Sequence, residues 1–272
     1  MNRRLLLGVG LLFVLVASAG CTSIFGGGVS DEKLDENATY DWDQVHGWDV
    51  DENGTARPVK SSETTDAYVN VTGESYHAVY HLENYSKEDF EMWTRGISNE
   101  DPIDIWALRY RYPNGTVVKG SELNVYKTNY RTHVELPKSA NGTNGTIAFS
   151  ASAEPKSFYQ PNYMEGSYEV VLPKGMRTSF FLFGQIVPGP DETNIEDGRL
   201  HIRWENVDRT ISVKYYLQRD FYIFMGAVGV LGLATIIGMA YYWYRIKELT
   251  ALRENLGMSM EFEDDGNDPP GF

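Results

Sequence analysis

The run FYIFMGAVGVLGLATIIGMAYYWY, residues 221–244, decides how this chain is organised, because it contains no charged side chain. At about 1.5 Å of rise per residue, a helix of this length crosses a hydrocarbon core of about 30 Å. Tyr222 lies near its start and four aromatic residues, 241–244, form its end, as in the interfacial belts of membrane helices. The run therefore predicts one transmembrane helix.

The residues after this run predict its orientation. Arg245, Lys247 and Arg253 follow closely, so the positive-inside rule places residues 245–272 in the cytoplasm and everything before the span outside. Apolar residues at helical spacing predict that the helix continues to about Gly257. Small residues within the span would allow close packing with another membrane helix; they are Gly226, Gly229, Gly232, Ala234 and Gly238.

The N-terminus has the pattern of an export signal. Arg3 and Arg4 precede a short apolar run, 5–17, and the small residues 18–20 precede Cys21. This order resembles a lipobox, in which residues 1–20 are removed and Cys21 is lipidated. Because Cys21 is the only cysteine, lipidation would also explain an otherwise lone thiol. An uncleaved signal anchor with an incidental cysteine is the alternative, and the arginine pair leaves Tat and Sec export both open.

Composition describes a folded domain with an acidic surface. Residues 21–37, with three consecutive glycines, are expected to form a flexible tether. The formal charge of the chain is −14, and residues 22–220 carry 31 acidic and 19 basic side chains, a charge of −12. The apolar content of 42% is too high for a disordered acidic tail. This balance argues against nucleic-acid binding, which requires a basic surface. An ordinary acidic protein has the same balance, and it is the lipobox and the Asn-x-Ser/Thr glycosylation triplets that favour a halophilic protein.

Asn-x-Ser/Thr triplets are over-represented in the region expected to be external. Such triplets are acceptor sites for N-glycosylation, and they also occur simply as turns. We expect glycosylation within the set Asn37, Asn53, Asn70, Asn84, Asn114, Asn141 and Asn144.

The external region is expected to be mainly β, with sandwich-like packing. Short runs rich in strand formers predict strands over 67–71, 75–82, 107–112, 116–118, 123–126 and 132–136. A second group is predicted over 146–153, 167–172, 179–183, 199–204 and 210–217.

One helix is expected among these strands. Ser86 can cap it, Phe90, Trp93 and Ile97 fall on one helical face, and Gly96 can end it. The run of residues 141–146 is an expected boundary between a β-rich domain with that helix, 38–140, and a sandwich-like juxtamembrane domain, 146–218. A single continuous β domain is the alternative.

The stretches "LPKGMRTSFFLFGQIVPGP", "DGRLHIRWENV" and "ISVKYYLQRDFYIF", together with the lipobox, tether and span, resemble an uncharacterised family of haloarchaeal surface proteins. The resemblance covers most of the chain in layout and is sharpest over 172–224. It implies a lipobox-bearing, single-span protein at the cell surface. It implies no activity and transfers no site residues.

Residues that could carry chemistry are few. His77 and His81 have a metal-ligand spacing, but the run SYHAVYHL is typical of a strand with solvated histidines. Glu100, Asp101 and Asp104 suit surface better than a calcium site. No nucleotide-binding or hydrolase motif occurs, so we expect no catalytic residue, metal or cofactor. Tyr40, Trp42 and Trp48 favour core packing over a glycan-binding surface.

These patterns support three hypotheses of function. The leading one is a non-catalytic, glycosylated membrane lipoprotein whose external β module acts in interaction or envelope architecture, with membrane lipid as one partner. The second is an accessory subunit of a membrane complex, contacted through the span. The third, an extracytoplasmic hydrolase, has no motif to support it.

Overall fold

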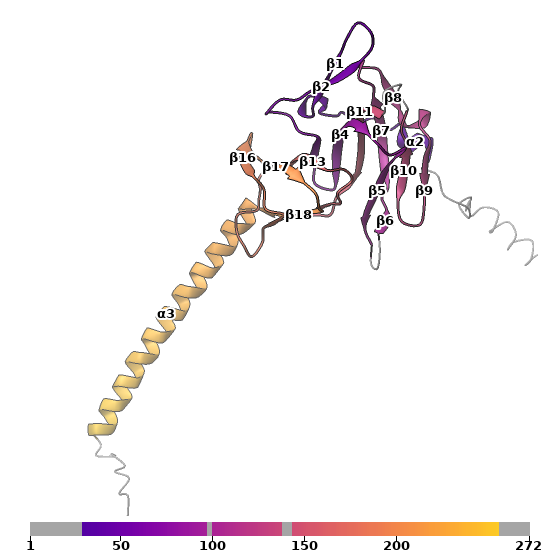
Figure 1. The fold of residues 1–272 in the computed structure, drawn as a ribbon. Coiled ribbons are helices and arrows are strands. Elements are labelled where there is room, and N and C mark those ends of the chain that lie inside the picture. The colour runs from indigo at the N-terminus through magenta and orange to yellow at the C-terminus, as the bar shows by residue number, and fades with distance from the viewer. Residues whose placement is uncertain (1–28, 97–99, 138–142, 256–272) are drawn as a thin grey trace, which may run out of the picture. The chain divides into compact units, whose positions relative to one another are not determined.

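A computed structural model describes residues 29–96, 100–137 and 143–255, in two compact units: residues 1–217 and residues 218–272. The first unit is mainly β and the second contains one long helix, α3 (Gln218–Asn255) (Figure 1). Each unit is considered by itself. The predicted signal peptide, Cys21, Asn141, and the tail from residue 256 onward lie outside the described residues.

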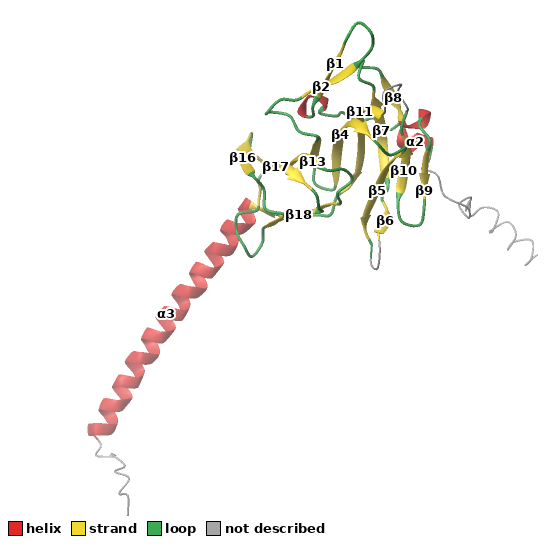
Figure 2. Ribbon diagram, in the orientation of Figure 1, coloured by secondary structure: helices red, strands yellow, loops and turns green. Residues whose placement is uncertain are grey.

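An eight-stranded sheet forms the centre of the β unit (Figure 2). Its strands, in spatial order, are β16 (Glu192–Glu196), β17 (Arg199–Val207), β13 (Gly166–Val171), β3 (Ala67–Val71), β4 (Ser75–Tyr85), β11 (Thr143–Ser152), β7 (Ile105–Arg111) and β8 (Val117–Lys119).

Smaller sheets and short helices complete the unit. A four-stranded sheet has the order β6 (Glu100–Pro102), β5 (Asp89–Arg95), β10 (Thr132–Glu135), β9 (Val125–Lys127). A three-stranded sheet has the order β12 (Ser157–Gln160), β18 (Ile211–Lys214), β15 (Gln185–Val187). The two-stranded pairs are β1 (Gly47–Val50) with β2 (Ala56–Val59), and β14 (Met176–Arg177) with β19 (Tyr216–Leu217). The short helices are α2 (Asp31–Leu34), η1 (Trp42–Gln44) and η2 (Gly120–Glu122).

One face of the large sheet carries the main core. Residues alternate along each strand, so Tyr76, Ala78 and Tyr80 of β4 all point to the same side. There the ring of Tyr80 lies 5.2 Å from that of Phe90 in the four-stranded sheet. The ring of Tyr76 lies 5.3 Å from that of Phe158 in the three-stranded sheet. Both smaller sheets therefore pack on this face, which is the predicted sandwich-like arrangement.

The opposite face is covered by the segment that precedes β1. The Tyr40 hydroxyl donates a hydrogen bond of 2.6 Å to the carbonyl of Ala107, on β7. Val45 and Tyr40 share a second, smaller core with Val79 and Ala148 of the large sheet. The chain before β3 thus belongs to the domain and closes its outer face.

The large sheet crosses the expected domain boundary near residues 141–146. β11 lies between β4 and β7, and β13 pairs in parallel with β3, with Tyr168 opposite Ala67. The prediction of two domains, 38–140 and 146–218, is therefore wrong, and its alternative of one continuous β domain describes the fold. The Asn-Gly-Thr repeat of residues 141–146 predicts a boundary, whereas Thr143 already begins β11.

Two predicted elements take a different form. The expected helix over 86–97 is strand β5, because Phe90 and Met92 are buried while their neighbours are not, and β5 pairs with β10. The expected strand over 179–183 is a turn in which the amides of Phe183 and Gly184 both donate to the carbonyl of Phe180. Aromatic content alone suggested a strand there, but no neighbouring strand pairs with this stretch among the described residues.

The part of the expected tether that is described, from residue 29, packs on the domain. Leu34 of α2 is buried, and one guanidinium, that of Arg109, donates to the carbonyls of Leu34, Asp35 and Glu36. Asp35 also accepts a hydrogen bond of 2.8 Å from the Ser121 hydroxyl. Residues 31–36 are therefore fixed, which a glycine-rich, polar sequence did not indicate.

The second unit confirms the long apolar helix. α3 has 38 residues and is long and apolar enough to cross a membrane. It begins directly after β19 and continues past the uncharged run to Asn255, as the helical spacing of apolar residues predicted. None of its side chains is buried within the chain.

Candidate functional site

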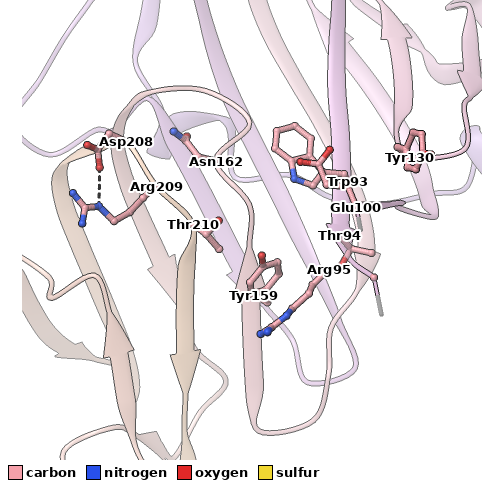
Figure 3. A pocket seen from close by; sticks show the side chains of 11 residues that line it. Trp93, Thr94, Arg95, Glu100, Tyr130, Tyr159, Asn162, Asp208, Arg209 and Thr210 are labelled. Carbon is pink, nitrogen blue, oxygen red and sulfur yellow. Dashed lines mark hydrogen bonds and ion pairs between the residues drawn. The ribbon is translucent and has the colours of Figure 1, made fainter. Parts of the chain in front are cut away.

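An open groove of about 1060 Å³ lies where the two smaller sheets meet (Figure 3). One wall comes from β5 and β6, with Trp93, Thr94, Arg95 and Glu100. The other comes from β12 and the turn before β18. The remaining residues that line the groove are Gly96, Tyr130, Tyr159, Asn162, Asp208, Arg209 and Thr210.

The first wall is built around the indole of Trp93. The guanidinium of Arg131 lies 4.3 Å from the centre of that ring. The same guanidinium forms ion pairs with Glu91, at 2.6 Å, and Glu100, at 2.8 Å. The cation and the ring attract each other, and the two carboxylates prevent the guanidinium from turning away. Trp93 is therefore a fixed, flat surface beside the groove.

The base of the groove ties the two sheets together. The Tyr163 hydroxyl donates a hydrogen bond of 2.7 Å to the backbone carbonyl of Trp93, and their rings meet edge to face at 5.1 Å. Beside them, Asn162 Oδ1 is buried and accepts no hydrogen bond from any described residue. Because this oxygen is inaccessible, it belongs to the packing behind the groove and not to the surface that the groove presents.

Charges of both signs line the groove. Arg209 is held by Asp208, with 2.9 Å between Nε and Oδ1. Arg95 is exposed, and Figure 3 shows its side chain extending beside Tyr159. Guanidinium groups recognise carboxylates, phosphates and sugar hydroxyls, and aromatic faces add stacking.

The described lining residues offer groups suited to binding. They include no histidine, cysteine or serine, and both carboxylates, Glu100 and Asp208, are engaged by arginines. Nucleophilic and acid–base chemistry requires such groups free and adjacent. The groove is therefore suited to recognition of a polar ligand.

The predicted glycosylation sites differ in accessibility. The side chains of four of them are exposed, namely Asn37, Asn53, Asn84 and Asn114. Asn114 lies in the turn between β7 and β8, as predicted, where Gly115 takes a positive φ of 86°. These four meet the first requirement for a glycan acceptor, which is an accessible amide.

Two other predicted acceptors are engaged in the fold. Asn144 is only 8% exposed, and its Oδ1 accepts a hydrogen bond of 2.7 Å from the amide of Asn84. Asn70 donates to Asp41 and accepts 2.6 Å from Arg199. The folded domain does not present the Asn144 amide, so modification there would have to precede folding.

The histidines with metal-ligand spacing are engaged by other side chains of the fold. His77 and His81 lie on the same face of β4, but His77 Nδ1 is 2.7 Å from the Ser150 hydroxyl and His81 stacks on Trp48. Across the described residues, no group of three or more histidine, cysteine or acidic side chains is arranged to hold a metal.

Two other sequence clusters are structural. Glu100 pairs with Arg131 and Asp104 with Lys127, so this acidic cluster is a paired surface. Tyr40 is buried, and its ring meets that of Trp42 at 5.7 Å, as expected for core packing. The groove itself was not predicted, since its lining comes from four separate segments and contains no motif.

Comparison with known proteins identifies the family. The profile of a family of unknown function (DUF5803) matches residues 63–261, which is more than half of the chain. The matched region runs from just before β3 through α3, so it includes both units. No curated protein matches the chain. The chain belongs to this uncharacterised family.

Proposed function

We propose that this family member is a non-catalytic, membrane-anchored surface protein whose β domain binds a polar partner outside the membrane. One observation carries the proposal: the last strand of the domain, β19, ends at Leu217 and the long apolar helix α3 begins at Gln218. No spacer separates the folded domain from the helix. The domain therefore stands at the surface of whichever membrane holds α3.

Charge supports the orientation. Arg245, Lys247 and Arg253 follow the uncharged part of α3, whereas the domain before it carries an excess of carboxylates. Basic residues near the end of a span favour the cytoplasmic side. The C-terminus is accordingly assigned to the cytoplasm and the β domain to the outside, where the exposed triplets of Asn37, Asn53, Asn84 and Asn114 would be glycosylated.

The groove supports a role in recognition. It offers a fixed indole, two arginines and two tyrosines, Tyr130 and Tyr159. Such a surface fits an extracellular polar group, such as the acidic sugar or carboxylate of a neighbouring surface protein. Membrane lipid around α3 is the second partner.

Protease treatment of intact cells tests the topology. Two epitope tags are needed, one inserted at Asn53 in the β1–β2 turn and one after Phe272. The first tag should be lost and the second retained, while lysis should expose both. Loss of the C-terminal tag alone would overturn the orientation, and release of the protein by carbonate washing would overturn the span.

Co-purification from gently solubilised membranes tests the recognition role. Arg95→Ala with Tyr159→Ala should remove a stoichiometric partner that Arg57→Ala, at an exposed arginine on β2, leaves bound. A partner that survives the groove variant but is lost with Gly229→Leu in α3 would instead favour the accessory-subunit hypothesis. The Cβ position of Gly229 is open, so this substitution is tolerated within the chain.

A further inference from the structure

A short apolar loop projects from the β domain between β14 and β15. In this phenylalanine loop (residues 178–184), Phe181 is 81% exposed and Leu182 is 59% exposed. The two ends of the loop lie close together: a Cβ on Gly184 would lie 2.1 Å from the carbonyl oxygen of Thr178. The turn is closed by hydrogen bonds to the carbonyl of Phe180. A rigid turn that holds adjacent apolar side chains in solvent marks an interaction surface.

The phenylalanine loop is tied to the strand that leads into α3. β14 pairs with β19, with Arg177 opposite Tyr216. The Ser179 hydroxyl lies 3.2 Å from the Tyr216 hydroxyl, and the Phe183 ring lies 6.0 Å from the Tyr216 ring. The loop and Tyr216 therefore form one structural element of the β domain.

Chain length limits how far this element can be from the membrane. The uncharged run begins at Phe221, five residues after Tyr216. Five residues span at most about 18 Å when fully extended, and about 8 Å when helical. The headgroup region adds about 5–8 Å on each side of the hydrocarbon core. Wherever the span is inserted, Tyr216 lies within about 18 Å of the hydrocarbon core, and the phenylalanine loop is attached to Tyr216.

The local charge also fits a lipid surface. The chain has 38 acidic residues, yet there is none over 170–190, which contains the phenylalanine loop, or over 209–219, which leads into α3. The charged residues of these two segments are all basic: Lys174, Arg177, Arg209, Lys214 and Arg219. Arg209 and Arg219 pair with the flanking residues Asp208 and Asp220, so the excess positive charge comes from Lys174, Arg177 and Lys214. The acidic surface of the domain is thus interrupted at the segments nearest to α3. Anionic lipid headgroups attract basic residues by about 1 kcal/mol each.

We infer that the phenylalanine loop inserts Phe181 and Leu182 into the outer interface of the bilayer that α3 spans. The inference deepens the proposed function and rests on it, because it needs α3 in the membrane. Aromatic side chains favour this interfacial depth. A second point of contact would limit the tilt and rotation of the domain above the membrane and fix the direction in which its groove faces.

Spin labelling of the full chain in vesicles of phosphatidylcholine and phosphatidylglycerol tests the inference. In a Cys21→Ser background, a nitroxide is placed at Leu182→Cys, at Val59→Cys on β2 as the matched control, and at Gly232→Cys within α3. Val59 is 51% exposed, close to the value for Leu182. Collisions with oxygen report lipid and collisions with a water-soluble nickel complex report water.

The three labels separate the outcomes. The nitroxide at 182 should collide several-fold more with oxygen than with nickel, as at 232, while the nitroxide at 59 shows the reverse. Water exposure at 182 with lipid exposure at 232 overturns the inference alone. Low access to both reagents at 182 shows that protein covers the loop, and this also overturns it. Water exposure at 232 overturns the proposed span itself.

Discussion

The indole of Trp48 lies against the imidazole of His81, with 4.4 Å between ring centroids and 25° between planes. His46 meets the same imidazole edge to face at 5.7 Å. His81 is fully buried, and neither of its ring nitrogens has a hydrogen-bond partner among the described residues. Burial lowers the pKa of His81 to about 4, and the charge of His46 acts in the same direction, against the carboxylates of Asp66 and Glu83.

This cluster makes the domain sensitive to acid. An unfolded His81 titrates near pH 6.5 and the folded one near pH 4, so the unfolded state binds the proton first as the pH falls. Protonation of unfolded His81 has little effect on the free energy of unfolding above pH 6.5. Below pH 6.5 it lowers that free energy progressively. Between pH 7 and pH 5 the loss is about 2 kcal/mol.

The substitution His81→Phe should remove this loss. A phenyl ring keeps the stacking on Trp48 and has no nitrogen to protonate, so stability at pH 7 should change little or rise. Urea titrations at pH 7 and pH 5 measure the difference. An unchanged pH dependence in the variant would show that His81 is not the group responsible.

Arg109 should fix the N-terminal segment. Arg109→Gln removes a charged donor to three carbonyls of residues 34–36, and each hydrogen bond to a charged group contributes about 1.5–3 kcal/mol. We expect faster amide hydrogen exchange over residues 31–36 with little change in β4 or β11. Equal exchange in both proteins would mean that burial of Leu34 alone holds the segment.

Glycosylation should follow accessibility. Peptide mass spectrometry of the native protein should find glycans among Asn37, Asn53, Asn84 and Asn114 and none at Asn144. The variant Asn114→Gln should lose one glycan without loss of stability. Asn144→Ala should cost about 1–3 kcal/mol, since it leaves the Asn84 amide without its acceptor. A set of wholly unmodified triplets would contradict the proposal of a glycosylated surface.

Cys21 should be the site of processing. Cys21→Ser should stop cleavage and leave a precursor heavier by about two kilodaltons, the mass of the signal. The variant should stay in the membrane fraction, because a span anchors far more strongly than a lipid. Normal maturation of the variant would exclude the lipobox.

Salt should stabilise the β domain. Its carboxylates repel over a Debye length of about 30 Å at 0.01 M salt and about 3 Å at 1 M. Thermal melts of a fragment of residues 22–219 should therefore rise steeply between these limits. A rise that continues in molar salt would indicate stronger apolar burial. Equal melting temperatures would contradict adaptation to high salt.

Local patterns in the sequence predicted local structure well. Alternation of apolar residues located β17 and β18, and the absence of charge located α3. The spacing of apolar residues failed where it fits both a helix and a strand. Phe90 and Trp93 fit one face of a helix, yet Phe90 and Met92 form the buried side of β5. Only pairing with β10, about forty residues later, decides between the two.

Long-range arrangement could not be predicted from these patterns. The parallel pair of β3 and β13 joins residues about a hundred positions apart, and nothing local to either strand specifies the other. The groove has the same origin, because its walls belong to two sheets whose strands are far apart in the sequence. Motifs in the sequence therefore indicate no site, whereas the structure assembles a groove from scattered side chains.

The parallel pair also determines the order in which the large sheet can form as the chain is synthesised from its N-terminus. β3 meets β4 almost at once, but its other edge stays bare until β13 has emerged, about a hundred residues later. Bare strand edges attract other chains. The final strand, β19, then arrives immediately ahead of α3. β19 pairs with β14, whereas the large sheet receives its last strand with β17. A chain interrupted before β13 would therefore leave the second edge of β3 open to pairing with neighbouring chains.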